Sequence, residues 1–214
     1  MTPMSAERHR IPLYLVPDSA PVEVDDADLA RALLADERWA PAATWNRFAP
    51  MVFRMASRAL GSEHEAEDVT QEVFFRLFAR AKTLQSPESF RSFVTSFAIR
   101  ILKWELRRKR AHSWLSFREP KDMPETPYLG SDPEARDVLR RFYSMLGRLK
   151  PRDRLVYCLR HRDGRSLDEI ADAMEISLST VRRAHDRSTT RVSQWIASDA
   201  GLSGFLRERS LRGA

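Results

Sequence analysis

Cysteine, glycine and long apolar runs are all scarce in this sequence of 214 residues. A single cysteine excludes an intramolecular disulfide and is compatible with a reducing compartment. No apolar run approaches the roughly 20 residues of a membrane-spanning helix, and residues 1–10 lack the apolar core of a secretory signal peptide. Only seven glycines and few alternating apolar and polar residues argue against a β-sheet. We therefore predict an all-α protein of the cytoplasm.

Catalytic and metal-binding motifs are also lacking. The letters His-Arg-Asp at 161–163 match a kinase catalytic triplet, but the chain has no glycine-rich loop and no Asp-Phe-Gly segment, so a helix end is the better interpretation. Three aspartates lie within residues 25–28 without further ligands, and one of them is expected to cap a short helix. Cys158 and His161 have a metal-ligand spacing, but a lone cysteine beside leucines points to the core. We predict no enzyme, no metal site and no cofactor.

Positive charge and hydrophobic residues are both plentiful. The net charge of +6 suits a polyanionic partner, and 43% hydrophobic residues are enough to build packed cores. The expected architecture is two small helical domains joined by a flexible linker, with a helix-turn-helix in the second. Breaks in the helical periodicity divide the chain into a leader (1–25), a first helical domain (26–112), a linker (113–132), a second helical domain (133–197) and a tail (198–214).

Capping residues mark the helices of the first domain. Gly61 is expected to end one helix, and Ser62 with Glu65 forms a capping box that starts the next. Ser86 precedes a proline, which places serine at an N-cap and proline at the first helical position. These signals predict helices over about 41–60, 62–82 and 86–110.

The segment from Ser166 to His185 predicts two short helices joined by a tight turn. Ser166 begins a capping box, Ser177 lies at a second N-cap, and Val181 is the apolar anchor of the second helix. This is the plan of a DNA-binding helix-turn-helix, whose second helix enters the major groove. The alternative is a helical hairpin with a solvated basic face. The side chains expected to point outward are Ser179, Arg182, Arg183, Asp186 and Thr190.

The helix expected over 86–110 carries a basic stripe on one side. Arg100, Lys103, Arg107 and Arg110 fall within roughly a quarter of its circumference, and Trp104 lies beside them. Cations next to an exposed aromatic ring can hold phosphates while the ring stacks on an unpaired base. The alternative is that Trp104 is buried and the charges form a solvated face.

The helix expected over 62–82 carries a different kind of surface. Asp68, Gln71, Glu72 and Phe75 gather on the side opposite its apolar stripe. A large aromatic side chain among acidic and amide groups indicates a protein partner more than a catalytic pair. The alternative is that Phe75 packs under a neighbouring helix.

Together these motifs resemble bacterial RNA polymerase sigma factors of the sigma-70 class, and the compact extracytoplasmic-function group fits best. Residues 66–78 are similar to region 2.2, and residues 90–108 are similar to regions 2.3 and 2.4. Residues 149–154 with 166–187 are similar to region 4. The resemblance covers about 41–112 and 133–196.

The resemblance implies a promoter-specificity subunit whose partners are core RNA polymerase, promoter DNA and an anti-sigma factor. A flipped base of the −10 strand would lie near the loop Leu84–Ser89. The polymerase-binding residues would be Asp68, Gln71, Glu72 and Phe75. The −10 element would be read by Arg100, Lys103, Trp104, Arg107, Arg108 and Arg110, and the −35 element by Ser177, Ser179, Thr180, Arg182, Arg183 and Arg187.

Three positions depart from the family pattern. Arg100 stands where asparagine is common, and Trp104 where aspartate is common. Glu175 occupies the turn position that glycine usually takes, at a cost of about 1 kcal/mol if its backbone is left-handed. A rival interpretation of the whole chain is a stand-alone helix-turn-helix regulator that binds DNA without polymerase.

Overall fold

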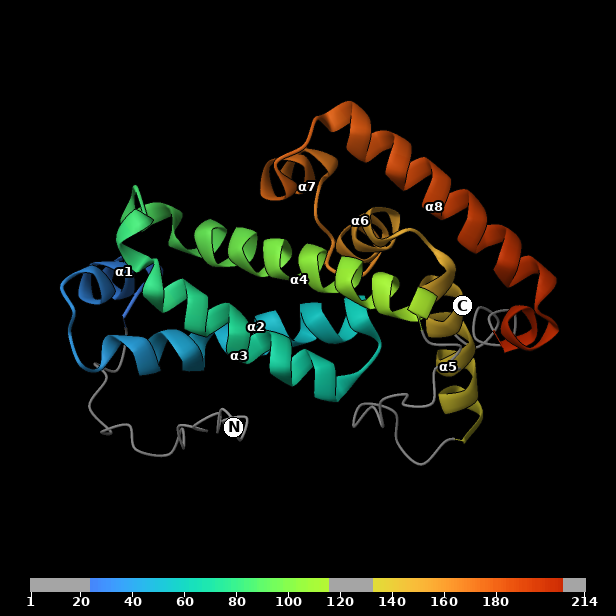
Figure 1. The fold of residues 1–214 in the computed structure, drawn as a ribbon, viewed down its shortest axis with the longest axis horizontal. Coiled ribbons are helices and arrows are strands. Elements are labelled where there is room, and N and C mark those ends of the chain that lie inside the picture. The colour runs from blue at the N-terminus through green and yellow to red at the C-terminus, as the bar shows by residue number, and fades with distance from the viewer. Residues whose placement is uncertain (1–23, 116–132, 206–214) are drawn as a thin grey trace, which may run out of the picture.

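The computed structural model describes residues 24–115 and 133–205, and within these ranges all regular elements are helices (Figure 1). The predicted all-α class with two helical domains is confirmed. No helix in these ranges combines the length and apolar character needed to cross a bilayer. The elements are α1 (Asp26–Leu34), α2 (Ala40–Leu60), α3 (Glu63–Ala79), η1 (Ala81–Thr83), η2 (Pro87–Ser89), α4 (Phe90–Leu115), α5 (Pro133–Arg148), α6 (Pro151–His161), α7 (Leu167–Met174) and α8 (Leu178–Ser198).

Side-chain caps begin the helices where the sequence predicts them. The Asp25 carboxylate accepts a hydrogen bond from the backbone N–H of Asp28 at 2.7 Å, which satisfies one free donor at the start of α1. Ser166 and Glu169 form the complete capping box of α7, and the Ser177 hydroxyl caps α8. Local signals of three or four residues were therefore sufficient to locate these helix starts.

The segment before α4 differs from its prediction. Ser86 is not a side-chain cap, because its hydroxyl donates to Glu88 at 2.5 Å. The next three residues form the 3-10 turn η2, and the α-helix begins only at Phe90. Serine followed by proline is typical of the start of an α-helix and of a 3-10 turn, so this pair of residues does not distinguish the two.

Helical structure extends further than the sequence predicts at two places. α4, predicted to end near Arg110, continues to Leu115. The predicted tail is helical again over 200–205, where Leu202 is buried and its N–H binds the Asp199 carboxylate at 3.0 Å. One buried leucine gives no apolar periodicity, which is why the tail lacked a helical signal. The predicted leader before residue 24 and most of the predicted linker lie outside the described residues.

Helix α4 lies at the centre of the fold, with α2 and α3 along one side and α6 and α7 along the other (Figure 1). Its buried residues Phe90, Val94 and Leu102 belong to a hydrophobic core that includes Ile170 and Met174 of α7. The two domains therefore share one continuous apolar core. The second domain adds a smaller cluster of Leu146, Leu149, Cys158 and Val192.

Gly61 lies where the turn between α2 and α3 meets the second domain. Its φ of +70° is left-handed, which glycine adopts without steric cost. A Cβ at this position would lie 3.1 Å from the Tyr143 ring of α5. The sequence predicted the helix end but not the close approach of a distant helix.

We expect Gly61→Ala to lower the free energy of unfolding by about 2–3 kcal/mol, because it combines left-handed strain with a clash against Tyr143. Gly164 is the matched control: its φ is +69°, and no atom lies within 4 Å of a Cβ built there. Gly164→Ala should cost only about 1 kcal/mol. Urea unfolding of both variants measures the difference, and equal losses would contradict the packing of α5 on this turn.

Candidate nucleic-acid interfaces

The second helix of the helix-turn-helix presents its predicted basic residues to solvent. Val181, Ala184 and Ser188 are buried and fix the inner side of α8. Arg182 and Arg183 are exposed, and neither forms an ion pair with another residue of the described ranges. The Ser177 hydroxyl bonds those of Ser179 at 3.1 Å and Thr180 at 2.8 Å. Two free guanidinium groups near a helix N-terminus suit base edges and phosphates in a major groove.

Arg187 has a different environment from the other arginines of α8. Its Nη2 lies 2.9 Å from the Asp153 carboxylate, which is only 1% exposed in the first turn of α6. This hydrogen bond raises the pKa of Arg187 above its usual value. Arg187 thus ties α8 to α6, and its predicted contact with DNA stays a prediction.

The basic stripe of α4 includes the exposed ring of Trp104. Trp104 is 52% exposed, so the alternative that Trp104 is buried is wrong. The guanidinium carbons of Arg76 and Arg108 lie 5.8 and 5.6 Å from the ring centroid. Arg76 was missed by the sequence analysis because it comes from α3, and no local pattern links it to α4. Glu72 holds it through a 2.6 Å hydrogen bond.

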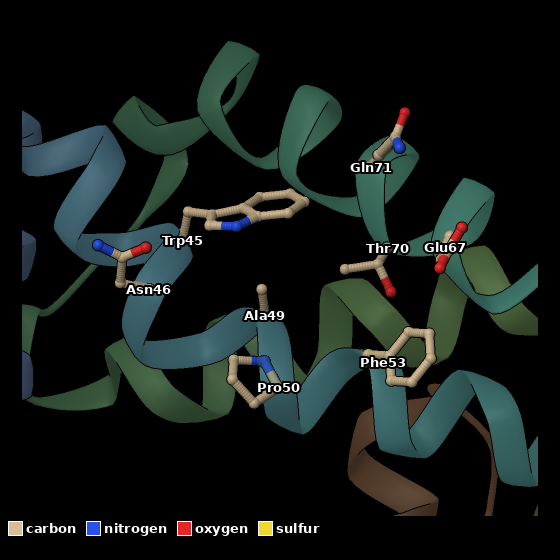
Figure 2. A pocket seen from close by; sticks show the side chains of 8 residues that line it. All are labelled: Trp45, Asn46, Ala49, Pro50, Phe53, Glu67, Thr70 and Gln71. Atoms are coloured by element: carbon tan, nitrogen blue, oxygen red, sulfur yellow. The ribbon is translucent and has the colours of Figure 1, made fainter. Parts of the chain in front are cut away.

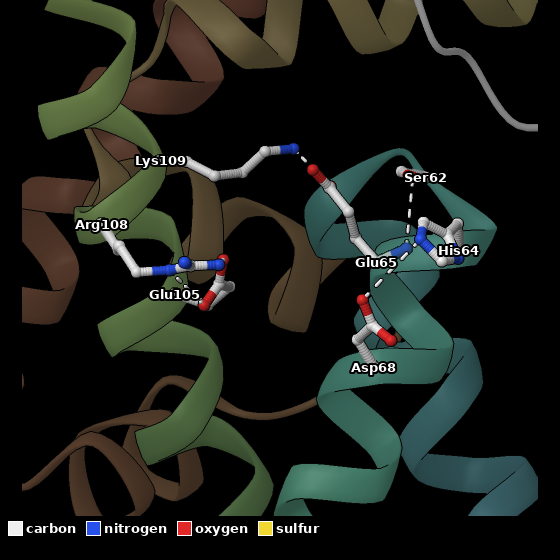
Figure 3. A network of polar contacts seen from close by, with 7 residues as sticks. All are labelled: Ser62, His64, Glu65, Asp68, Glu105, Arg108 and Lys109. Atoms are coloured by element: carbon white, nitrogen blue, oxygen red, sulfur yellow. Dashed lines mark hydrogen bonds and ion pairs between the residues drawn. The ribbon is translucent and has the colours of Figure 1, made fainter. Parts of the chain in front are cut away.

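A network of polar contacts joins α3 to α4 (Figure 3). Arg108 donates hydrogen bonds to both carboxylate oxygens of the nearly buried Glu105, at 2.6 to 3.1 Å. Lys109 pairs with the Glu65 carboxylate across the two helices. The predicted capping box of α3 is therefore only half formed: the Ser62 hydroxyl accepts from the Glu65 N–H, while the Glu65 side chain binds Lys109.

Three residues of the predicted −10 set touch the second domain. An Arg100 guanidinium nitrogen lies 3.0 Å from a Glu175 carboxylate oxygen, and the Lys103 ammonium donates to the Met174 carbonyl at 3.2 Å. Arg110 donates to the Leu149 carbonyl at 3.5 Å. Arg107 is exposed and has no ion pair within the described residues. No local sequence pattern predicts these contacts, because each joins residues that are 39 to 75 positions apart.

The acidic and aromatic patch of α3 is open to solvent. Phe75 is 72% exposed, so the alternative that it packs under a neighbouring helix is wrong. Asp68 and Gln71 are exposed beside it, and Glu72 is partly covered by its ion pair with Arg76. A phenylalanine this exposed suits the centre of a protein–protein contact. The geometry agrees with a docking surface and does not resemble a catalytic pair.

A groove of about 350 Å³ lies between α2 and α3, next to this patch (Figure 2). Gln71 belongs to both the groove and the patch, and Glu67 is the groove's one ionisable lining residue. Neither helix brings a nucleophile and a base together there. The residues that line the groove are Trp45, Asn46, Ala49, Pro50, Phe53, Glu67, Thr70 and Gln71.

The lone cysteine lies away from this groove, in the core of the second domain. Burial raises the pKa of the Cys158 thiol to about 11, which keeps the thiol protonated.

Both halves of this arrangement match family models. Residues 44–112 match sigma-70 region 2, and residues 139–188 match sigma-70 region 4. The chain belongs to the sigma-70 family, in its extracytoplasmic-function group. Over 155 residues it is 26% identical to the extracytoplasmic-function sigma factor SigE of Mycolicibacterium smegmatis, covering 70% of this chain and 58% of that relative. The chain thus spans less than two thirds of this relative's length.

Two solved structures share the fold of this sigma factor. CnrH, solved in complex with the cytosolic domain of CnrY, matches with a TM-score of 0.59 and 22% identity over 82% of this chain and 99% of that one. RpoE of Bartonella quintana, solved with the anti-sigma factor NepR, matches with a TM-score of 0.57 and 17% identity over 73% and 96%. At these identities the likeness concerns the fold alone.

The surroundings of Arg187 and Arg182 predict that removing Arg187 destabilises the fold more than removing Arg182 does. Arg187→Ala leaves the buried Asp153 carboxylate without its partner, so we expect the free energy of unfolding to fall by about 1–3 kcal/mol. Arg182→Ala removes an exposed side chain and should change it by less than about 0.5 kcal/mol. Chemical denaturation measures both. Equal stability of the two variants would contradict the structural role of the Arg187–Asp153 pair.

Proposed function

We propose that this chain is a dissociable promoter-specificity subunit of RNA polymerase. The observation that supports it most is that three different helices carry exposed residues suited to different partners: cationic side chains on α4 and α8, and an acidic aromatic patch on α3. A single DNA duplex carries negative charge along its whole length and can meet both cationic surfaces. The patch of opposite character would be left for the polymerase.

The second domain would read the −35 element in duplex form. Arg182 and Arg183 are the strongest candidates for base contacts, because both are exposed and neither is held by a carboxylate. Ser179 and Thr180 lie one turn earlier, where a recognition helix approaches phosphates and base edges. Each bidentate contact between arginine and guanine is worth roughly 1–3 kcal/mol of discrimination.

The first domain would bind the −10 strand after the duplex opens. Trp104 offers an exposed ring, and Arg107 offers a guanidinium group without an ion pair in the described residues for the backbone phosphates, beside Arg108, which Glu105 holds. Stacking of a base on an aromatic side chain contributes roughly 1–3 kcal/mol, which offsets the few kcal/mol spent on unstacking. Because Arg76 and Arg108 lie against the ring, they would also set its orientation.

Phe75 and Asp68 would anchor the first domain on core polymerase, with Gln71 and Glu72 around them. Sigma factors are not enzymes, so in this proposal the chain makes no bond and polymerase performs the chemistry. The site of action would be the cytoplasm, where polymerase meets DNA. CnrH and RpoE were each solved with a protein partner, and we propose an anti-sigma factor as the corresponding partner here.

A stand-alone DNA-binding regulator is the remaining alternative, favoured by the helix-turn-helix considered by itself. This alternative provides no binding partner for the exposed Phe75. Run-off transcription with purified core polymerase on genomic fragments separates the two functions. Specific start sites that depend on this chain support the sigma factor, whereas duplex binding without any core-dependent transcript supports the regulator.

Loss of the α3 patch should weaken assembly with polymerase. We expect Asp68→Lys combined with Phe75→Ala to weaken core binding by tenfold or more, on the order of 1.4 kcal/mol, with helicity unchanged. Glu67→Lys is the control, because Glu67 is also exposed but lines the groove against α2. Circular dichroism and a pull-down with core polymerase measure the outcome. If the double variant binds core polymerase as tightly as the unaltered chain does, the patch is not part of the interface.

Arg182→Ala or Arg183→Ala should weaken −35 recognition by roughly 1–3 kcal/mol if the contact is bidentate to guanine. Arg191→Ala is the matched control, because Arg191 is exposed on the same helix, about two and a half turns after Arg182 and on the opposite side of the helix axis. Transcription from templates with intact and altered −35 elements measures the effect. The altered template should be insensitive to the Arg182 change, and sensitivity equal to that of the intact template would contradict the assignment.

A further inference from the structure

The turn between α7 and α8 lies against the basic stripe of α4. Glu175 in this turn pairs with Arg100 at 3.0 Å, and the carbonyl of the preceding Met174 accepts a hydrogen bond from Lys103 at 3.2 Å. Both cations belong to the face proposed to hold the −10 strand. The helix-turn-helix therefore occupies part of the other domain's candidate DNA site.

Glu175 holds an unfavourable backbone conformation at this contact. Its φ of 53° is left-handed, a region that residues other than glycine adopt rarely. A strained position that carries a carboxylate aimed at an arginine of the opposite domain points to a function for that carboxylate.

The ion pair is the adjustable part of a larger contact. Ile170 and Met174 of α7 are buried in the core that contains α4, so apolar packing supplies most of the closure. The Arg100–Glu175 pair is exposed on both sides, 44% and 66%, and exposed pairs are individually weak. Removing this weak ion pair while the apolar packing remains can shift the equilibrium between the closed and open forms without eliminating either form.

We propose that the Glu175 turn is an autoinhibitory latch that shields the −10 face of α4 until the domains separate. This inference rests on the proposed function, because it requires that α4 bind the open DNA strand. The Met174 carbonyl takes one of the three ammonium hydrogens of Lys103, and a strand approaching Arg100 meets the Glu175 carboxylate. Single-stranded DNA and the closed form therefore compete for one surface.

The latch does not cover the other DNA surface. Arg182 and Arg183 lie on the exposed side of α8 while Arg100 and Lys103 are engaged. In the closed protein part of the single-strand face is thus covered, while the duplex face stays open. Opening the latch should therefore change the affinity for single-stranded DNA alone. A general change of net charge would instead change the affinity for both single-stranded and duplex DNA.

The test uses the full chain and two pairs of variants. Glu175→Gln and Glu175→Arg disrupt the latch, and the matched controls Asp172→Asn and Asp172→Arg make the same charge changes. Asp172 is exposed on α7 and has no side-chain partner among the described residues. Fluorescence anisotropy measures the affinity for a mixed-sequence single-stranded 12-mer and for the same sequence as duplex. Acylation of Lys103 by an amine-reactive ester, relative to Lys82, reports opening directly.

We expect Glu175→Gln to bind the single strand about two- to fivefold more tightly than Asp172→Asn, and Glu175→Arg roughly three- to tenfold more tightly than Asp172→Arg. Duplex affinity should differ by less than about twofold within each pair. Acylation of Lys103 should rise only in the Glu175 variants. Thermal melting of all four variants confirms that the fold is retained.

The latch is overturned if Lys103 reactivity is the same in Glu175→Arg and Asp172→Arg. It is also overturned if reactivity rises while single-strand affinity stays the same, because the shielded face then binds no DNA. Core-dependent transcription by the unaltered chain is measured alongside. A failed latch leaves that transcription intact, whereas transcription is absent if the proposed function is wrong.

Discussion

Different sides of helix α4 serve two different roles, packing of the core and the proposed binding of DNA. Its apolar side is the centre of the first domain's core, with Phe90 and Leu102 fully buried. Its remaining surface is basic and carries the candidate strand-binding residues. Because α7 packs on this same helix, any arrangement of the second domain that touches α4 also changes what DNA can reach. Packing and recognition are therefore coupled through a single element.

The carboxylate partners of the arginines distinguish structural cations from available ones. Arg187 binds the buried Asp153, and Arg108 binds Glu105 while its guanidinium also lies against Trp104. Arg182 and Arg183 have no such partner in the described parts of the chain. A net charge of +6 alone does not reveal this division, because it counts every arginine equally. The surroundings of each guanidinium decide whether it holds the fold together or remains free for phosphate.

The sequence predicted features that depend on nearby residues. Ser166, Glu169 and Ser177 placed the helix-turn-helix because capping acts over three positions, and the exposure of Phe75 followed from helical periodicity. Contacts between distant segments were not predictable in this way. No local pattern joins Arg100 to Glu175 or brings Arg76 to Trp104, since both depend on how separate helices pack.

The distance between the two domains is the quantity that tests this account most directly. Spin labels on cysteines introduced at the exposed Glu67 and Thr190 would report it by pulsed electron resonance, because the buried Cys158 is protected from labelling. The account predicts one narrow, short distance distribution for the free chain and a longer one after core polymerase is added. A broad distribution in the free chain that polymerase leaves unchanged would contradict it.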